Sequence, residues 1–169
     1  AYDFIKRKIT TITIIAIIIS IATPQIDRMK DQAVLTQTIQ SLKIIDDTIH
    51  TVEQTTGTVK ILTLSLTKGK LEIIPLLDKI QYTLENSRVK FSEINKTIKQ
   101  GDLYYTTTEQ GKRFHVTLEI HYNNTLNLTF SGENNRNVTI QGGAPVLLHI
   151  KNVGDNKIGE KSHIDLSLG

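Results

Sequence analysis

The chain has 169 residues, no cysteine and a formal net charge of +3. The absence of cysteine excludes disulfides, thiolate metal sites and cysteine nucleophiles. The small net charge, with Lys and Arg mixed among Asp and Glu beyond the first residues, is typical of a solvated surface and argues against a nucleic-acid groove. A chain of this length holds one hydrophobic element and one modest domain.

The chain begins with a short basic segment. Residues 1–8 read Ala-Tyr-Asp-Phe-Ile-Lys-Arg-Lys, and the triplet Lys6, Arg7 and Lys8 directly precedes an apolar run. Basic residues in this position are what the positive-inside rule expects of a cytoplasmic flank. We interpret the triplet as a topology signal rather than as a specific contact.

Residues 9–22 form an uncharged apolar stretch that lacks one polar face. Because apolar side chains fall on every side of a helix here, the stretch needs lipid or other proteins around it. Its 14 residues are fewer than the roughly 20 that span a bilayer, but counting from Phe4, with snorkelling basic side chains, extends it towards that length. The isoleucines expected to lie in a membrane or a filament core are Ile9, Ile12, Ile14, Ile15, Ile17, Ile18, Ile19 and Ile21.

The helical pattern continues beyond this stretch. Pro24 removes one helical hydrogen bond and predicts a bend. An amphipathic stripe then follows, and its members are Ala22, Ile26, Met29, Ala33, Leu35, Ile39, Leu42, Ile45, Ile49 and Val52. Gly57 is a natural C-terminal cap. We therefore predict one helix over about residues 2–55, roughly 80 Å long, whose N-terminal half needs partners outside its own domain.

After Gly57 the apolar period changes from helical to alternating. We predict strands over residues 58–67 and 70–74, joined as a hairpin at Thr67-Lys68-Gly69, and further strands over 79–84 and 103–108. The clearest strand is 113–122, in which residues 114, 116, 118, 120 and 122 share the apolar face. Residues 85–100 fit neither period.

Alternation recurs at residues 126–130, 138–140, 146–151 and 164–168. Short strands separated by polar turns indicate an antiparallel β-sandwich. The predicted fold class is α+β, with a long N-terminal hydrophobic helix over residues 1–56 and a β-sandwich surface domain over residues 57–169.

Two segments carry a family resemblance. The apolar stretch lies at the chain's own N-terminus, and residues 138–154 place Gly142-Gly143 before a strand that ends in Asn152-Val153-Gly154. In this order they resemble archaeal type IV pilins; bacterial pilins carry glutamate where this chain has Ile5. The resemblance implies a leader removed ahead of Ala1 by a leader peptidase, an apolar helix that waits in the membrane, and assembly machinery that moves it into a filament core.

Residues with catalytic or metal-binding chemistry do not form a recognisable site. His115 and His121 share a strand face but lie about 20 Å apart, which is too far for one ion. The other histidines are His50, His149 and His163. Asp46 and Asp47 are adjacent in a helix and point about 100° apart, and phosphate loops and nucleophile elbows are absent. We expect no enzyme activity, no cofactor and no metal.

Asn-x-Thr motifs, the acceptors of N-linked glycans, occur at Asn95, Asn123, Asn127 and Asn137. Asn127 and Asn137 fall on the polar faces of their strands, which we expect to be neighbours, and Asn123 falls in a turn. Glycans at such outward positions would suit an extracellular surface.

We therefore expect a structural subunit of an extracellular type IV pilus-like filament, which is held in the membrane before assembly and presents its β-sandwich for adhesion. Its partners would be identical subunits, not nucleic acid. The alternative is a membrane-anchored extracellular binding module that never polymerises, such as a surface-layer or archaellum accessory subunit. An archaellin-like motility filament is a third interpretation.

Overall fold

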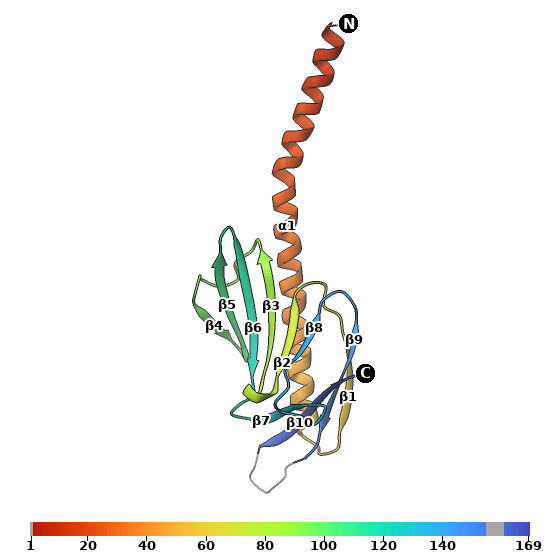
Figure 1. Cartoon of the computed structure of the whole chain (residues 1–169), viewed down its shortest axis with the longest axis vertical. Coiled ribbons are helices and arrows are strands. Elements are labelled where there is room, and N and C mark those ends of the chain that lie inside the picture. Colours follow the sequence, from red (N-terminus) through yellow and green to blue (C-terminus); the bar gives the residue numbers. More distant parts are fainter. Residues whose placement is uncertain (1, 155–160) are drawn as a thin grey trace.

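The computed structural model describes the backbone of residues 2–154 and 161–169, and the side chains of residues 13, 17, 19, 20, 22–154 and 161–169. A single long helix, α1 (Tyr2–Glu53), projects from a β-rich domain that surrounds its C-terminal half (Figure 1). The helix predicted over residues 2–55 is confirmed to within two residues. It ends before Gly57, which lies in the following turn at φ +82° and donates its N–H to the Asn152 carbonyl.

The described strands form two sheets. A four-stranded sheet has the order β1-β9-β10-β7, and a six-stranded sheet has the order β4-β5-β6-β3-β2-β8. The strands are β1 (Val59–Leu64), β2 (Lys70–Ile74), β3 (Lys79–Ser87), β4 (Thr97–Gln100), β5 (Leu103–Gln110), β6 (Arg113–His121), β7 (Leu126–Phe130), β8 (Val138–Gln141), β9 (Val146–Asn152) and β10 (Ser162–Leu168), with a short 3-10 helix, η1 (Pro75–Leu77), before β3. The α+β class is confirmed.

Two expectations about strand pairing are wrong. The sheets are not wholly antiparallel, because β10 pairs with β7 in parallel. The predicted hairpin between residues 58–67 and 70–74 does not form either: β1 pairs with β9, whereas β2 pairs with β3 and β8 in the other sheet. The connection between β1 and β2 therefore crosses from one sheet to the other.

Gly69 is needed at this crossing for a reason other than a hairpin turn. Its φ is +82°, and a Cβ added there would lie 2.4 Å from the Tyr82 hydroxyl oxygen. That hydroxyl donates to the Lys68 carbonyl at 2.6 Å. The glycine signal in the sequence was real, but it marks a close approach of the connection to β3.

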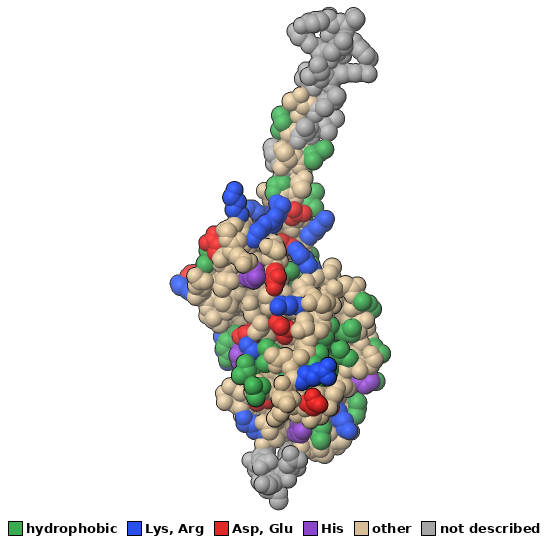
Figure 2. Space-filling model, in the orientation of Figure 1, with side chains coloured by type: hydrophobic (Ala, Val, Ile, Leu, Met, Phe, Trp, Pro, Cys, Tyr) green, Lys and Arg blue, Asp and Glu red, His purple; other side chains and the backbone are tan. Residues whose placement is uncertain are grey.

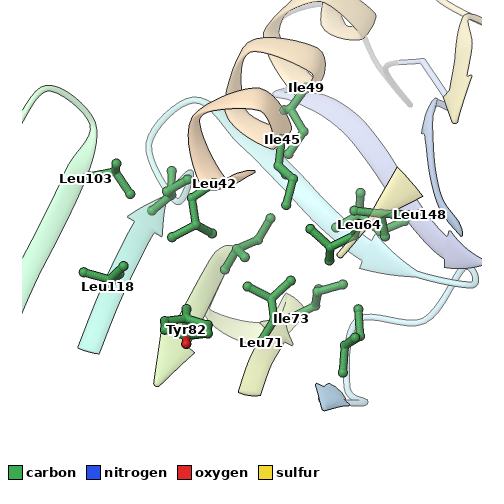
Figure 3. Packing of buried hydrophobic residues seen from close by; sticks show 14 of the residues in the cluster. Leu42, Ile45, Ile49, Leu64, Leu71, Ile73, Tyr82, Leu103, Leu118 and Leu148 are labelled. Carbon is green, nitrogen blue, oxygen red and sulfur yellow. The ribbon is translucent and has the colours of Figure 1, made fainter. Parts of the chain in front are cut away.

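The core lies between α1 and both sheets. Figure 3 shows Leu42, Ile45 and Ile49 of the helix directed towards apolar residues of both sheets. Tyr82 of β3 and Leu148 of β9 are among these residues. The predicted faces of β6 are confirmed, because Val116, Leu118 and Ile120 are buried. The helix is thus part of the core over its C-terminal half, and the core is not formed by sheets alone.

The amphipathic stripe packs over less of its length than expected. From Val34 to Val52 the helix contributes to the buried core, with Leu35, Leu42, Ile45 and Ile49 fully buried. Ile26 and Met29, which belong to the predicted stripe, are exposed, although the start of β6 reaches this part of α1.

Candidate interaction surfaces

The projecting part of α1 carries exposed apolar side chains. Ile17 is 53% exposed and Ile19 is 58% exposed, and Met29 reaches 71%. Of the isoleucines expected in a membrane or filament core, these two are the ones whose side chains the structure describes; Ile9, Ile12, Ile14, Ile15, Ile18 and Ile21 lie outside the described side chains. Large apolar groups exposed together on a helix mark a surface that needs a partner.

Two polar side chains of this segment bond to the helix itself. Ser20 Oγ donates to the Ile17 carbonyl and Thr23 Oγ1 donates to the Ile19 carbonyl, each at 2.8 Å. Hydroxyls satisfied in this way can face an apolar partner without leaving an unpaired donor. The helix continues through Pro24, whose missing N–H removes the donor to the Ser20 carbonyl. The bend expected there stays a prediction.

Within the part of the chain that the structure describes, no helix has the combined length and apolar character needed to cross a membrane.

A network of charges fixes α1 where it leaves the sheets. Asp31 is 5% exposed, and its carboxylate accepts hydrogen bonds from Lys68 Nζ at 2.9 Å and from the Arg88 backbone N–H at 2.8 Å. The Arg88 guanidinium pairs in turn with Asp27 at 2.9 Å. The network joins the helix to the β1–β2 connection and to the end of β3, so the projecting segment has a defined direction.

Cationic side chains gather around this exit (Figure 2). A groove of about 750 Å³ runs between α1 and the sheet ends, and adjoining grooves extend it round the helix. We call their cations the basic collar: Arg28, Lys30, Lys68, Arg88, Lys90, Lys112 and Arg113. The carboxylates lining the same grooves are Asp27 and Asp31, which are already paired with Arg88 and Lys68. The collar is therefore positively charged.

The opposite end of the six-stranded sheet has an acidic groove of about 370 Å³, lined by Lys43, Asp46, Asp47, Gln100, Gly101, Asp102 and Leu103. It lies between α1 and the β4–β5 turn. Burial raises the pKa of Asp46, and the nearby charges of Asp102 and Asp47 raise it further. The hydrogen bond from Tyr122 and the charge of His50 act in the opposite direction but do not cancel the rise. Burial also raises the pKa of Tyr122, whose hydroxyl faces this carboxylate.

The strand β6 has a polar face that the sequence places in solvent, but Glu119 on that face is partly buried. Its carboxylate accepts a hydrogen bond from Lys79 Nζ at 2.8 Å and lies 3.1 Å from His121 Nε2. Burial alone would raise the pKa of Glu119, but the hydrogen bonds from Lys79 and His121 hold that pKa below its usual value. Charge pairing across strands thus stabilises this face of the sheet.

Asn152 has a role that sequence reasoning missed. Its side-chain Nδ2 donates to the carbonyls of Val52 and Glu53 at 3.1 and 3.0 Å, and its Oδ1 accepts the Gly154 N–H at 2.8 Å. The last carbonyls of a helix lack partners within the helix, so Asn152 caps α1 from β9. Gly154 has φ +93°, and a Cβ there would lie 2.9 Å from Thr56 Cγ2. The Asn-x-Gly signal was visible in the sequence, but its contact with the helix end was not.

The four acceptor asparagines are all exposed. Asn95, Asn123, Asn127 and Asn137 lie on the surface of the domain. Asn127 is in β7 and Asn137 directly precedes β8, so they belong to different sheets; the expectation that their strands are neighbours is wrong. Thr129, the hydroxyl residue of the Asn127 motif, is buried and donates to Asp165 Oδ1 at 2.6 Å.

Among the residues with described side chains, no three or more His, Asp or Glu residues are grouped so that they could hold a metal ion. No family model, curated protein or solved structure matches the chain.

Proposed function

We propose that this chain is a structural subunit of an extracellular type IV pilus-like filament. One observation supports the proposal above the others: the same helix is locked into its own domain over Val34–Val52 and projects exposed isoleucines beyond it. Burying one such side chain stabilises by roughly 1.5–3 kcal/mol, so the projecting half is stabilised when identical helices pack around it.

In this proposal, assembly exchanges one apolar environment for another. The apolar segment is held in the membrane after its leader is removed by a leader peptidase, and assembly machinery then transfers it from lipid to the helices of neighbouring subunits. Contacts of this kind join different surfaces of identical chains and need not close into a ring. The β domain stays outside, where it presents a polar and glycosylated surface for adhesion.

The alternative is a membrane-anchored extracellular binding module that does not polymerise. The exposed apolar helix would suit an anchor equally well, and the grooves around α1 would then receive a ligand instead of a neighbour.

Electron microscopy of material purified from the native cell surface separates the two functions. If the chain is a filament subunit, the micrographs should show long fibres of constant diameter, and mass spectrometry should identify this chain as their main component. Isolated particles, or a signal confined to the membrane fraction with no fibres, would contradict the proposal and favour the binding module.

A further inference from the structure

The collar and the acidic groove carry charges that the domain itself does not neutralise. No ion pair joins Arg28, Lys30 or Lys112 to a carboxylate within the described part of the chain. Asp47 and Asp102 in the acidic groove likewise form no ion pair with a cation within the described part of the chain. Glu109, exposed near the β5–β6 turn, is one further carboxylate at the collar end. The chain therefore presents an unneutralised positive surface and an unneutralised negative one.

Part of the collar lies on the same side of the molecule as the acidic groove. The collar is completed by the β5–β6 turn with Lys112 and by the start of β6, whereas the acidic groove is completed by the β4–β5 turn with Asp102. Strand β5 runs from one to the other (Figure 1). This part of the collar and the acidic groove thus adjoin α1 on the side of the six-stranded sheet.

Their separation can be measured along two elements. Arg28 and Asp46 are 18 residues apart in α1, which is five turns, so they share a helix face at about 27 Å along the axis. Strand β5 has eight residues, which span about 27 Å. Helix and strand therefore give the same spacing between the collar and the acidic groove.

We infer that the basic collar binds the acidic groove of a second copy of this chain, with the two helices parallel and displaced by about 27 Å along their axis. The inference rests on the proposed filament. The contact is heterologous, so each subunit offers its collar to one neighbour and its groove to another, and the series stays open. Opposite charges at such a contact fix the register of the subunits, because other registers would place like charges together.

Charge reversal tests this contact in full-length subunits expressed in cells that make the filament. The collar variant combines Arg28→Glu with Lys112→Glu, and the groove variant combines Asp47→Lys with Asp102→Lys. These four side chains are exposed, and the substitutions leave the Asp31 network and the Tyr122–Asp46 hydrogen bond in place. A matched control combines Lys60→Glu with Lys151→Glu, two exposed lysines on the four-stranded sheet.

Each reversal alone is expected to lower the pelleted filament protein by about tenfold or more, since like charges then meet at every contact. One chain that carries both reversals restores the opposite charges and is expected to assemble. Co-expression of the collar variant with the groove variant is expected to restore filaments too, with the two subunits alternating. The Lys60/Lys151 control should assemble like the parent chain.

A second measurement places the contact directly. The chain has no cysteine, so Arg28→Cys with Asp47→Cys in one subunit should give a ladder of disulfide-linked multimers when filaments are oxidised. Lys60→Cys with Asp47→Cys is the control pair and should give no ladder.

Normal assembly of both single reversals would overturn the inference while leaving the proposed filament intact. A collar variant that fails and is not rescued by the groove reversal would also overturn it, and would assign the collar to another anion such as lipid headgroups. A parent chain that forms no filaments would instead remove the proposed function itself, and the subunit contact with it.

Discussion

The Tyr122 hydroxyl donates a hydrogen bond to Asp46 Oδ1 at 2.8 Å. Tyr122 directly follows β6 and is 2% exposed, and Asp46 belongs to α1. This bond therefore joins the helix to the six-stranded sheet. Hydrogen bonds to an ionised partner are stronger than those between neutral groups. The bond therefore helps to orient the whole helix on its domain.

Tyr122→Phe removes this hydrogen bond and keeps the buried ring. The loss should lower the free energy of unfolding by about 1.5–3 kcal/mol, the range for hydrogen bonds to charged groups. Urea unfolding of a fragment of residues 26–169 measures it, because that fragment keeps Asp27 and every helical residue of the described core. Tyr104→Phe, at a partly buried position of β5, is the control. A loss below about 0.5 kcal/mol would show that the bond contributes little.

The pH dependence of stability should reveal Asp46. Burial raises the pKa of the Asp46 carboxyl in the folded state above the ordinary value of 3.8. As pH rises, the carboxyl therefore loses its proton first in the unfolded chain, and the free energy of unfolding falls. Asp46→Asn does not titrate but can still accept from Tyr122. The variant should therefore gain stability relative to the parent as pH rises through the folded-state pKa, and the difference should then stay constant. Urea unfolding of both fragments between pH 3 and pH 7 gives this difference; a decrease with pH would mean that the folded-state pKa is lowered instead.

The sequence predicted the elements better than their arrangement. Apolar period alone located α1 and the buried face of β6, because both depend on residues near one another in the chain. Which strands pair depends on distant residues: β1 lies beside β9, more than eighty residues later, and the local glycine at position 69 falsely suggested a hairpin.

The same limit applies to the interaction surfaces. The exposed isoleucines of the projecting helix were predicted from composition, and Ile17 and Ile19 are indeed exposed. The basic collar was not predicted, because its cations come from distant parts of the sequence. These parts are α1, the β1–β2 connection, the residues after β3, and the β5–β6 turn with the start of β6. Asn152 was noticed in a motif, yet only the fold brings its amide to the carbonyls of Val52 and Glu53.

Asn152→Ala should destabilise the domain through the helix end. The substitution removes both hydrogen bonds to α1. The Val52 carbonyl keeps the longer bond from the Thr55 N–H at 3.3 Å, whereas the partly buried Glu53 carbonyl loses this donor. A buried group left unsatisfied costs about 1–3 kcal/mol. Asn124→Ala, at an exposed position beside β7, should stay within about 0.5 kcal/mol. Hydrogen exchange should show faster exchange over the last turns of α1 in the Asn152 variant; unchanged protection there would contradict the capping role.

Ile17→Asp or Ile19→Asp should abolish filaments while the domain stays folded. A charge placed among packed apolar helices cannot be solvated, whereas the domain's own core begins only at Val34. Gln40→Asp, an exposed position of the same helix alongside the sheets, is the matched control and should assemble. Sedimentation and electron microscopy measure assembly, and circular dichroism measures folding. Normal fibres from the Asp variants would show that contacts between β domains hold the filament together.

Glycan occupancy should differ between two acceptor sites. An N-linked acceptor needs the hydroxyl residue two positions after the asparagine. Thr129, which completes the Asn127 motif, is 8% exposed and donates to Asp165, whereas Thr139, which completes the Asn137 motif, is exposed. Asn127 can therefore be modified only before β7 and β10 pair, while Asn137 stays accessible in the folded domain.

Mass spectrometry of peptides from the native protein should find higher glycan occupancy at Asn137 than at Asn127, and Thr139→Ala should remove the glycan at Asn137 alone. Equal or reversed occupancy would contradict modification of the folded domain, and four unmodified asparagines would remove glycosylation from the proposed surface.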